Sequence, residues 1–264
     1  MLTASAIALA LVAHTPVLVH DSRERYPLAS VAAADVSAPA RGRDRRPTVY
    51  GRAVAASARA TWLQYWLFYA EQDQDRGILR SGRHAGDWEV VQYQVDSRGH
   101  PVEAVYSQHS GAERCSWQTV RRRKGRPLVY VARGSHASYL RPGTRDRMWP
   151  DPNDVANGRG RLVKPRLVRI DQRPPRWLGW PGRWGGARAR WCVPPEQDSP
   201  RGPAFQGQGR WSDPQSWARA ARRCQARCDR VGECDRPEAL LGGGAAIAAV
   251  AGIAFVGLRR RRRQ

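Results

Sequence analysis

The stretch Thr61–Tyr69, "TWLQYWLFY", constrains the fold most, because it is a continuous apolar and aromatic run that predicts a buried β-strand. Three more strand candidates follow it, over Asp87–Val95, Pro101–Gln108 and Pro127–Arg133. Glycine-containing turn signals, with Gly99 and Gly125, separate these three candidates. The order of strands and short turns predicts an antiparallel meander.

The composition favours a β-rich fold with long loops. The 264 residues include 25 Gly and 19 Pro, which suit an all-β or mixed fold better than a helical bundle. With 41% hydrophobic residues and 11 Trp, the chain can build a substantial core. Leu162–Ile170 predicts another strand, and the Trp-, Pro- and Gly-rich stretches Trp177–Gly186 and Ser199–Trp211 predict irregular structure packed by indole rings. Pro214–Cys228 predicts a short helix with Ser212 or Asp213 as its N-cap.

The formal net charge of +22 comes almost entirely from arginine. Arginines are spread along the whole chain, a usage that is typical of a GC-rich genome. A nucleic-acid binder more often concentrates its charge on one face or tail. We therefore expect no specific nucleic-acid partner, only weak, salt-sensitive adhesion to anionic surfaces.

The C-terminal region predicts a membrane anchor. Leu240–Leu258 is uncharged and mostly apolar over 19 residues, a helix length of about 28 Å against a bilayer core of roughly 30 Å. Five arginines, 259–263, follow at once and place that end in the cytoplasm. The alternative, a buried soluble helix, would not end in such a run. We expect a single-pass protein of the cell membrane with its body on the extracytoplasmic side.

The N-terminal segment, residues 1–13, resembles the apolar part of a signal peptide, although no basic residue precedes it. Export would permit disulfides. The five cysteines are Cys115, Cys192, Cys224, Cys228 and Cys234. The last three predict a small disulfide-linked stalk, with at least one bond among them, rather than a zinc site, since no histidine accompanies them.

The motif "HAGDWEVVQYQV" places His84, Asp87 and Glu89 within six residues at the start of a predicted strand. Alternation along that strand puts Asp87 and Glu89 on one face, roughly 6–7 Å apart, and Trp88 on the other. Two carboxylates on one face repel each other unless a cation or an arginine lies between them. His109 and His136 end two neighbouring strand candidates, each beside a serine, Ser107 or Ser135.

Two explanations of this cluster stay open. A divalent cation, Ca²⁺, Mg²⁺, Mn²⁺ or Zn²⁺, would suit His, Asp and Glu ligands. A structural network of carboxylates, histidines and an arginine, Arg83 or Arg133, would also balance the charges. The sequence has no Gly-x-Ser-x-Gly, phosphate-binding glycine loop or His-Glu-x-x-His motif.

Taken together, "HAGDWEVVQYQV", "AVYSQHSG" and "PLVYVARGSHASYLRPG" resemble the vacuolar protein sorting-associated protein 62 family and its bacterial relatives. The resemblance covers roughly Pro16 to Trp217. The biochemical activity of that family is essentially undefined, so the resemblance implies more about the fold than about the function.

A more distant resemblance is to the necrosis- and ethylene-inducing-like proteins, which carry a Gly-His-Arg-His-Asp-Trp-Glu heptad on a β-sandwich. Those proteins bind a divalent metal that is used in docking to membrane glycolipids. The resemblance implies His84, Asp87 and Glu89 as metal ligands, with Asp73 or Asp75 from the preceding loop. The second histidine of the heptad is Gly86 here.

We therefore expect an all-β protein, an antiparallel β-sandwich with long Trp/Pro/Gly-rich loops and one C-terminal transmembrane helix. The predicted parts are a signal-like segment (1–13), the sandwich (14–220), a cysteine stalk (221–239), the anchor (240–258) and an arginine tail (259–264). The expected function is a surface binding module with a divalent-metal site that recognises a glycan or a lipid headgroup. The alternative is a metal-dependent hydrolase with Asp87 or Glu89 as general base. Further cleft candidates are His109, His136, Ser107, Gln108 and Trp88.

Overall fold

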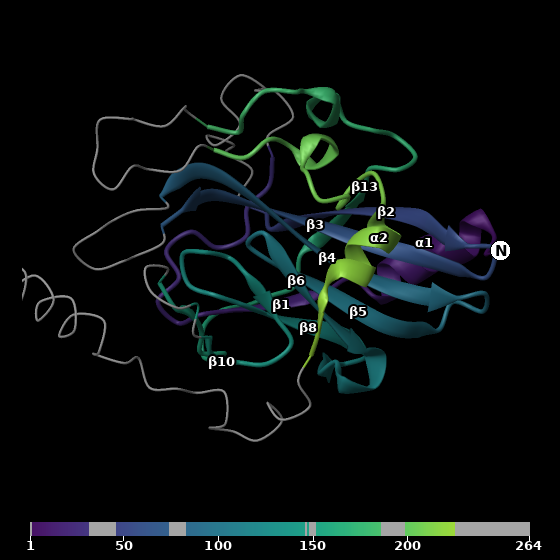
Figure 1. Cartoon of the computed structure of the whole chain (residues 1–264), viewed down its shortest axis with the longest axis horizontal. Helices are drawn as coiled ribbons and strands as arrows, with labels where there is room; N and C mark the ends of the chain where they lie inside the picture. The colour runs from purple at the N-terminus through teal and green to yellow at the C-terminus, as the bar shows by residue number, and fades with distance from the viewer. Residues whose placement is uncertain are drawn as a thin grey trace, which may run out of the picture.

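The structure, a computed structural model, describes residues 2–31, 46–73, 83–145, 147, 152–185 and 199–224. Its larger sheet has seven strands in the order β13-β2-β3-β4-β5-β6-β14 (Figure 1). These strands are β13 (Arg166–Arg169), β2 (Thr48–Ser57), β3 (Ala60–Gln72), β4 (His84–Asp96), β5 (Pro101–Gln108), β6 (Gly111–Ser116) and β14 (Arg222–Arg223). Strands β2 to β6 form an antiparallel meander, in which β3, β4 and β5 were predicted and β2 and β6 were not; β5 has the predicted bounds.

The smaller sheet has five strands in the described part of the chain. Strands β12, β1, β8 and β7 follow one another, and β9 pairs with β8. They are β12 (Leu162–Val163), β1 (Val17–His20), β8 (Arg126–Val131), β7 (Arg122–Arg123) and β9 (Ser138–Tyr139). A separate hairpin joins β10 (Gly143–Arg145) to β11 (Asp154–Ala156).

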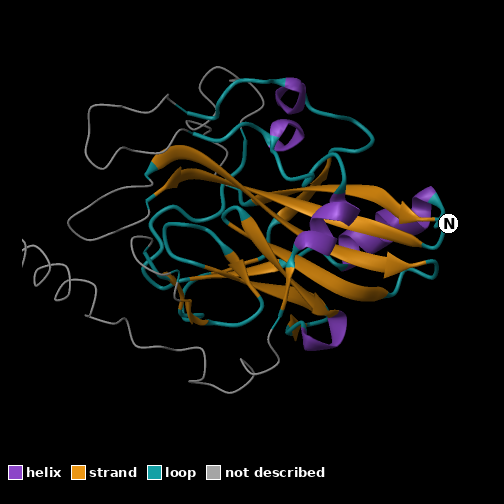
Figure 2. Ribbon diagram, viewed as in Figure 1, coloured by secondary structure: helices purple, strands orange, loops and turns teal. Residues whose placement is uncertain are grey.

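The main core lies between the two sheets. The smaller sheet contributes Leu18, Val129 and Val131, which belong to the same buried apolar cluster as Tyr65 and Val91 of the larger sheet. Burial of each such side chain stabilises the fold by roughly 1.5–3 kcal/mol. The described strands therefore form a two-layered, mostly β protein, as Figure 2 shows.

A second core covers the outer face of the larger sheet. Trp62, Trp66 and Trp88 from the sheet pack there with Trp177 and Trp184 from the loops that follow β13. The short helices of these loops, η3 (Arg176–Gly179) and η4 (Pro203–Phe205), lie beside the sheet, apart from β1 and β8 (Figure 1). The predicted indole-packed loops thus form a third layer.

Two buried glutamines form hydrogen bonds that join the C-terminal part of this layer to the larger sheet. Gln64 donates to the carbonyl oxygen of Arg210 and to the side chain of Gln92, both at 2.7 Å. Gln92 donates in turn to the carbonyl oxygen of Pro214 at 3.0 Å. Because these amides are buried, their hydrogen bonds hold the segment around Arg210 in one place.

Helices are few in the described residues. Helix α1 (Ala4–Ala13) corresponds to the predicted signal-like segment; its Leu11 is fully buried in the main core, and Tyr65 donates to the Leu11 carbonyl oxygen at 2.9 Å. Helix α2 (Pro214–Ala220) has the predicted cap, since Asp213 accepts from the backbone N–H of Ser216 at 3.0 Å. A short η2 (Trp117–Thr119) follows β6. None of the described helices is long and apolar enough to cross a bilayer, and the predicted anchor 240–258 lies outside the described residues.

Three details of the predicted topology were wrong. The sheets are not purely antiparallel, because the pairs β1–β8, β13–β2 and β14–β6 are parallel. Strand β8 is not part of the meander and instead belongs to the smaller sheet. Leu162–Ile170 is divided between the two sheets, since Pro165 lacks the N–H that a continuous strand needs. Strands β10 and β11 also form a hairpin where no strand was predicted.

One disulfide lies in the described residues and joins Cys115 on β6 to Cys224, just after β14. The backbone N–H of Cys224 also donates to the Arg114 carbonyl oxygen at 2.9 Å. Cys224 is therefore paired with a cysteine that is distant in sequence, and the predicted bond within the group Cys224, Cys228 and Cys234 stays a prediction. Cys192, Cys228 and Cys234 lie outside the described residues.

Candidate functional site

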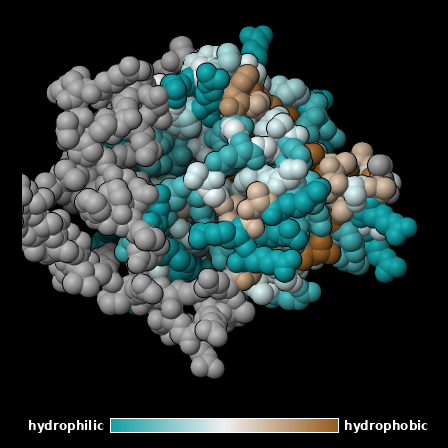
Figure 3. All heavy atoms as spheres, in the orientation of Figure 1, coloured by the Kyte–Doolittle hydropathy of each residue, from teal (hydrophilic) through white to brown (hydrophobic). Residues whose placement is uncertain are grey.

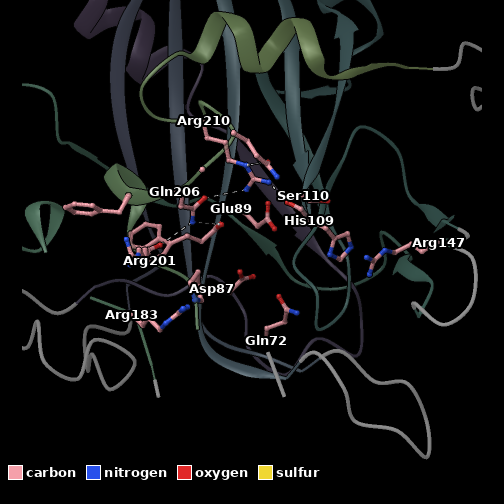
Figure 4. A pocket seen from close by; sticks show the side chains of 15 residues that line it. Gln72, Asp87, Glu89, His109, Ser110, Arg147, Arg183, Arg201, Gln206 and Arg210 are labelled. Carbon is pink, nitrogen blue, oxygen red and sulfur yellow. Dashed lines mark hydrogen bonds between the residues drawn. The ribbon is translucent and has the colours of Figure 1, made fainter. Parts of the chain in front are cut away.

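A cleft of about 550 Å³ opens at the end of the sandwich where β4 begins. Asp87 and Glu89 of β4, Gln72 at the end of β3 and His109 after β5 line it. The opposite wall comes from Arg183 and from the segment 200–210. Figure 4 shows the two carboxylates in the middle of the cleft, with arginines on several sides.

Local strand geometry brings Asp87 and Glu89 together. Tyr69 of β3 is the register partner of Asp87, and Leu67 is the partner of Glu89. The next residues on the same face, Val91 onwards, enter the core between the sheets. The prediction that Asp87 and Glu89 share one face of the strand is therefore confirmed. Both residues are buried, at 6% and 4% exposure.

His136 is the counter-charge of Asp87. Its Nδ1 lies 2.9 Å from Oδ2 of Asp87, and its Nε2 lies 3.7 Å from Oε1 of Glu24. The His136 ring is fully buried and stacks on Tyr69, with ring centroids 3.9 Å apart and planes within 3°. Three segments distant in sequence thus meet in one buried row, Glu24–His136–Asp87.

The row is charged at neutral pH. Burial opposes a charge on His136, but the hydrogen bond to Asp87 and the pair with Glu24 outweigh it and raise the pKa of His136 to about 9. Burial would raise the pKa of Glu24, yet His136 and the N–H groups of Gly134 and Tyr26 lower it to about 2. Burial likewise opposes ionisation of Asp87, but His136 keeps its pKa below the usual value.

Glu89 has a different environment. Burial and the neighbouring charge of Asp87 raise the pKa of Glu89 to about 7. The Ser107 hydroxyl donates to Glu89 and accepts from the backbone N–H of Val90 at 2.9 Å. Two carboxylates on one strand face thus have pKa values moved in opposite directions, so that Glu89 holds or releases a proton near neutral pH while Asp87 stays ionised.

A second buried carboxylate orients His109. Asp154 of β11 accepts from Nε2 of His109 at 2.7 Å, from the Ser135 hydroxyl at 2.6 Å and from the Tyr139 hydroxyl at 2.6 Å. These hydrogen bonds outweigh burial and lower the pKa of Asp154. His109 and His136 both have positive φ values, 54° and 56°, a backbone conformation that is rare outside glycine and is frequent at functional sites.

Two arginines of the cleft, Arg210 and Arg183, donate hydrogen bonds to backbone carbonyl oxygens. Arg210 donates to the carbonyl oxygen of His109, and its guanidinium lies 5.8 Å from the Trp217 ring centroid. Arg183 donates from Nη1 to the Ser199 carbonyl oxygen at 2.9 Å. Arg201 is exposed at the cleft edge. Figure 4 shows Arg183 and Arg201 on the same side of Asp87.

The predicted metal ligands have separate partners. His84 donates from Nδ1 to the Gly86 carbonyl oxygen at 2.8 Å, and Asp73 pairs with Arg25 at 3.1 Å. Asp75 lies outside the described residues. No three His, Cys, Asp or Glu side chains within the described ranges are placed together as a metal site. As placed, these residues do not fit a metal ion, and the metal site stays a prediction.

Gly86 allows the loop before β4 to pack closely. Its φ is +64°, and an added Cβ would overlap the carbonyl oxygen of Trp184. His109 and His136 adopt similar φ values, so it is the volume of a side chain that the position does not accept, including that of a histidine, the residue that the necrosis- and ethylene-inducing-like heptad has there. This departure has a structural reason in the third layer.

Sequence reasoning identified part of the site. Of the candidates, Asp87, Trp88, Glu89 and His109 line the cleft, while Ser107 and His136 lie behind the two carboxylates. Gln108 instead bonds Glu113 and the Ser138 carbonyl oxygen, at 3.2 and 3.3 Å. Arg83 pairs with Glu71 at 3.5 Å and is not the counter-charge of Asp87. Glu24, Asp154 and the cleft arginines were missed, since no local pattern marks them.

Comparison with known proteins agrees with the predicted resemblance. The family model described as vacuolar protein sorting-associated protein 62 matches residues 74–147. Two proteins of Saccharomyces cerevisiae are similar. The putative vacuolar protein sorting-associated protein TDA6 is 26% identical, and the match covers 54% of this chain and 41% of that protein. Vacuolar protein sorting-associated protein 62 is also 26% identical, and the match covers 57% of this chain and 42% of that protein. This chain thus spans about two fifths of the length of these relatives.

Solved structures of necrosis- and ethylene-inducing-like proteins are also similar. One is NLPPya in complex with glucosamine, with a TM-score of 0.43 and 16% identity over 66% of this chain and 80% of that chain. Another is the non-toxic HaNLP3 protein, with a TM-score of 0.43 and 16% identity over 66% and 81%.

Proposed function

We propose that this protein is a binding module whose cleft takes a polar, hydroxyl-rich ligand, either a glycan or a polar lipid headgroup. One observation carries the proposal: two buried carboxylates, one ionised and one near its pKa, lie side by side on the cleft floor. Such a pair offers acceptors from Asp87 and either a donor or acceptors from Glu89. Convergent polar groups in a concave site are what fix the orientation of a small ligand.

The walls suit the same class of ligand. Gln206 and Gln208 add amide groups to the cleft wall, and Phe205 is 38% exposed at the cleft edge. A partly exposed aromatic ring can pack against the apolar C–H face of a sugar while polar groups reach its hydroxyls. The Gln206 amide also donates to the Trp88 carbonyl oxygen at 3.4 Å, which ties this wall to β4.

The proposal is tested by binding to an array of neutral and charged glycans and lipid headgroups, with bound ligands then titrated by calorimetry. Phe205→Ala should weaken binding about tenfold, because it removes the aromatic surface. Val102→Ala is the matched control, since Val102 is a similarly exposed apolar residue at 41% and does not line the cleft. Equal affinities for both variants, or no ligand on the array, would count against the proposal.

A second candidate, a hydrolase, is supported by the opposite pKa shifts of Asp87 and Glu89, a pattern that assigns acid and base roles in enzymes. His109, held by Asp154, adds a third group for proton transfer. Such an enzyme would release new chain ends from a bound glycan. Recovery of the ligand unchanged after long incubation at pH 7 would reject this candidate.

We further propose that the module acts at the cell surface, exported by its N-terminal segment and anchored by residues 240–258. The apolar run and the arginines after it support this arrangement. Protease treatment of intact cells should degrade the body and leave a small C-terminal fragment. A body that stays protected in spheroplasts would contradict it.

A further inference from the structure

Helix α1 presents two large apolar side chains to solvent. Leu9 is 71% exposed and Val12 is 62% exposed, the two highest values for large apolar side chains in the described part of the chain. Residues three apart lie on one face of a helix, so the two side chains form a single apolar face. Figure 3 shows apolar and strongly hydrophilic side chains next to one another at the end of the molecule that carries the N-terminus (Figure 1).

This apolar face belongs to the folded body, because α1 is packed in place. Leu11 of the same helix is fully buried in the main core. Its carbonyl oxygen accepts hydrogen bonds from the hydroxyls of Tyr65 at 2.9 Å and Thr15 at 2.8 Å. Loss of residues 1–13 would uncover the core, so we expect α1 to stay in the protein after export.

A basic turn lies beside α1. Residues 121–124 of this turn are Arg-Arg-Arg-Lys, all four are exposed, and no carboxylate in the described residues pairs with them. The ring of His14, which follows α1, contacts the ring of Trp117 with centroids 5.6 Å apart. The Arg122 guanidinium lies 5.9 Å from the centroid of the same Trp117 ring. The apolar face and the basic turn are therefore neighbours, with Trp117 between them.

The chain leaves the body for the predicted anchor in the same region. Cys224, the last described residue, is bonded to Cys115, which lies two positions before Trp117. Residues 225–239 separate Cys224 from the apolar run 240–258, and a stretch of about 15 residues spans at most about 50 Å. An anchor at 240–258 would therefore keep this region at a high effective concentration beside the bilayer.

We propose that the apolar face of α1 and the basic turn 121–124 together dock on the anionic lipid surface of the membrane that carries the anchor. Cationic side chains attract anionic headgroups while an apolar helix face enters the headgroup region, and the two contributions together give firmer binding than either alone. This inference rests on the proposed anchoring of the protein in a membrane.

Docking in this orientation leaves the cleft accessible. Leu2, just before α1, lies beside Gly99 in the turn at the far end of β4, whereas the cleft opens where β4 begins. The cleft is then on the side of the body away from this bilayer, open to a ligand in the surroundings.

The test starts from full-length protein reconstituted in vesicles, with a specific protease site inserted between Glu238 and Ala239. Cleavage at this site severs the anchor and leaves every described residue in the body. At low salt the severed body should sediment at least tenfold more with vesicles that contain phosphatidylglycerol than with vesicles of phosphatidylcholine alone. This preference should decrease as salt rises, because the attraction between charges is screened.

Two variants test the two parts of the surface. The triple variant Arg121→Gln, Arg123→Gln and Lys124→Gln should reduce the preference for anionic vesicles to about twofold or less. The double variant Leu9→Ser and Val12→Ser should lower the bound fraction about fivefold, because it removes the apolar contact. Both variants should fold, since all five side chains are exposed. A double variant that binds like wild type, or a mature protein that begins after Val12, would reject the proposal.

The matched control for the triple variant is Arg23→Gln, Arg159→Gln and Arg161→Gln. It removes the same charge from exposed positions near His20, at the end of β1 remote from α1. Equal reductions for the two triple variants would assign the effect to net charge and reject the docking surface. Release of the severed body from both kinds of vesicle rejects docking but keeps the anchor, whereas uncut protein that alkaline carbonate extracts from the vesicles rejects both.

Discussion

Nδ1 of His136 lies 2.9 Å from Oδ2 of Asp87, and neither side chain is more than 8% exposed. Through this contact a histidine in the turn after β8 neutralises a carboxylate at the start of β4. The same histidine pairs with Glu24 at 3.7 Å. The charge pair therefore connects the two sheets at the floor of the cleft.

His136→Gln should destabilise the protein by about 3–5 kcal/mol at pH 7, because it leaves two buried carboxylates without their counter-charge. The raised pKa of His136 determines how its contribution to stability changes with pH. Its stabilising contribution is fully present below the unfolded-state value of 6.5 and is lost as pH rises through about 9. The difference from wild type in urea-unfolding free energy should therefore shrink above pH 9.

The matched control for this prediction is His100→Gln. His100 pairs with Asp96 at 3.6 Å but is exposed, so its loss should change stability by less than about 0.5 kcal/mol. Similar losses of stability for the two variants would show that the buried row Glu24–His136–Asp87 contributes no more to stability than an exposed ion pair.

Glu89→Gln should stabilise the protein above pH 7. Between pH 4.5 and about 7 the folded state keeps a proton on Glu89 that the unfolded state has released, so stability falls as pH rises through this range. The amide keeps the shape without the charge and should gain roughly 1–3 kcal/mol at pH 8. Melting temperatures from pH 4 to 9 check this, with Glu103→Gln as a control outside the cleft. A loss of stability at pH 8 would contradict the raised pKa.

The Cys115–Cys224 bond should be a strong determinant of stability. It closes a separation of 109 residues, for which chain entropy predicts roughly 4–5 kcal/mol. Cys115→Ser, Cys224→Ser and the double variant should lose about the same amount, since each removes one bond. Non-reducing peptide mapping checks the pairing, and it also tests the prediction of at least one bond among Cys224, Cys228 and Cys234. Additive losses would argue against the pairing.

The central strands could be predicted from sequence because their signals are local. The apolar run of β3, the alternation in β4 and the turns around Gly99 and Gly125 depend only on neighbouring residues. The parallel pairs could not be predicted in this way. Strand β13 adds to β2 after more than a hundred intervening residues, and nothing in either segment specifies the other. Leu162–Ile170 was predicted as one strand, although Pro165 lies between the two strands that it forms.

The candidate site was likewise predictable only where its signals are local in sequence. That Asp87 and Glu89 share a face follows from the period of a strand. Their partners come from elsewhere: His136 is 49 residues away, and Arg210 lies in an irregular segment held by Gln64. Such contacts depend on tertiary packing, which no spacing in the motif encodes.

Gly86→Ala should destabilise the protein more than Gly125→Ala. Both glycines have positive φ, +64° and +80°, so each substitution adds roughly 1–2 kcal/mol of backbone strain. Only at Gly86 would the new Cβ overlap Trp184, whereas nothing lies within 4 Å at Gly125. Overpacking should add about 1–3 kcal/mol at Gly86. Thermal unfolding of the two variants measures the difference. Equal losses of stability would show that the segment around Trp184 can shift to accommodate the new Cβ without destabilising the protein.

Chelation distinguishes the two explanations for the cluster of His84, Asp87 and Glu89. The described network balances Asp87 through His136 and Glu89 through its raised pKa, so from this network alone we expect the same melting temperature with and without a chelator. A metal that binds only the folded state would instead stabilise it by about 2.7 kcal/mol at a hundredfold excess over Kd. In that case the chelator should lower the melting temperature of wild type and of Asp171→Asn, a carboxylate remote from the motif in sequence, but not of Asp87→Asn. Metal analysis of the purified protein completes the test. One bound ion per chain, together with these chelator responses, would establish the metal site and would show that the hydrogen-bonded network alone does not explain the cluster.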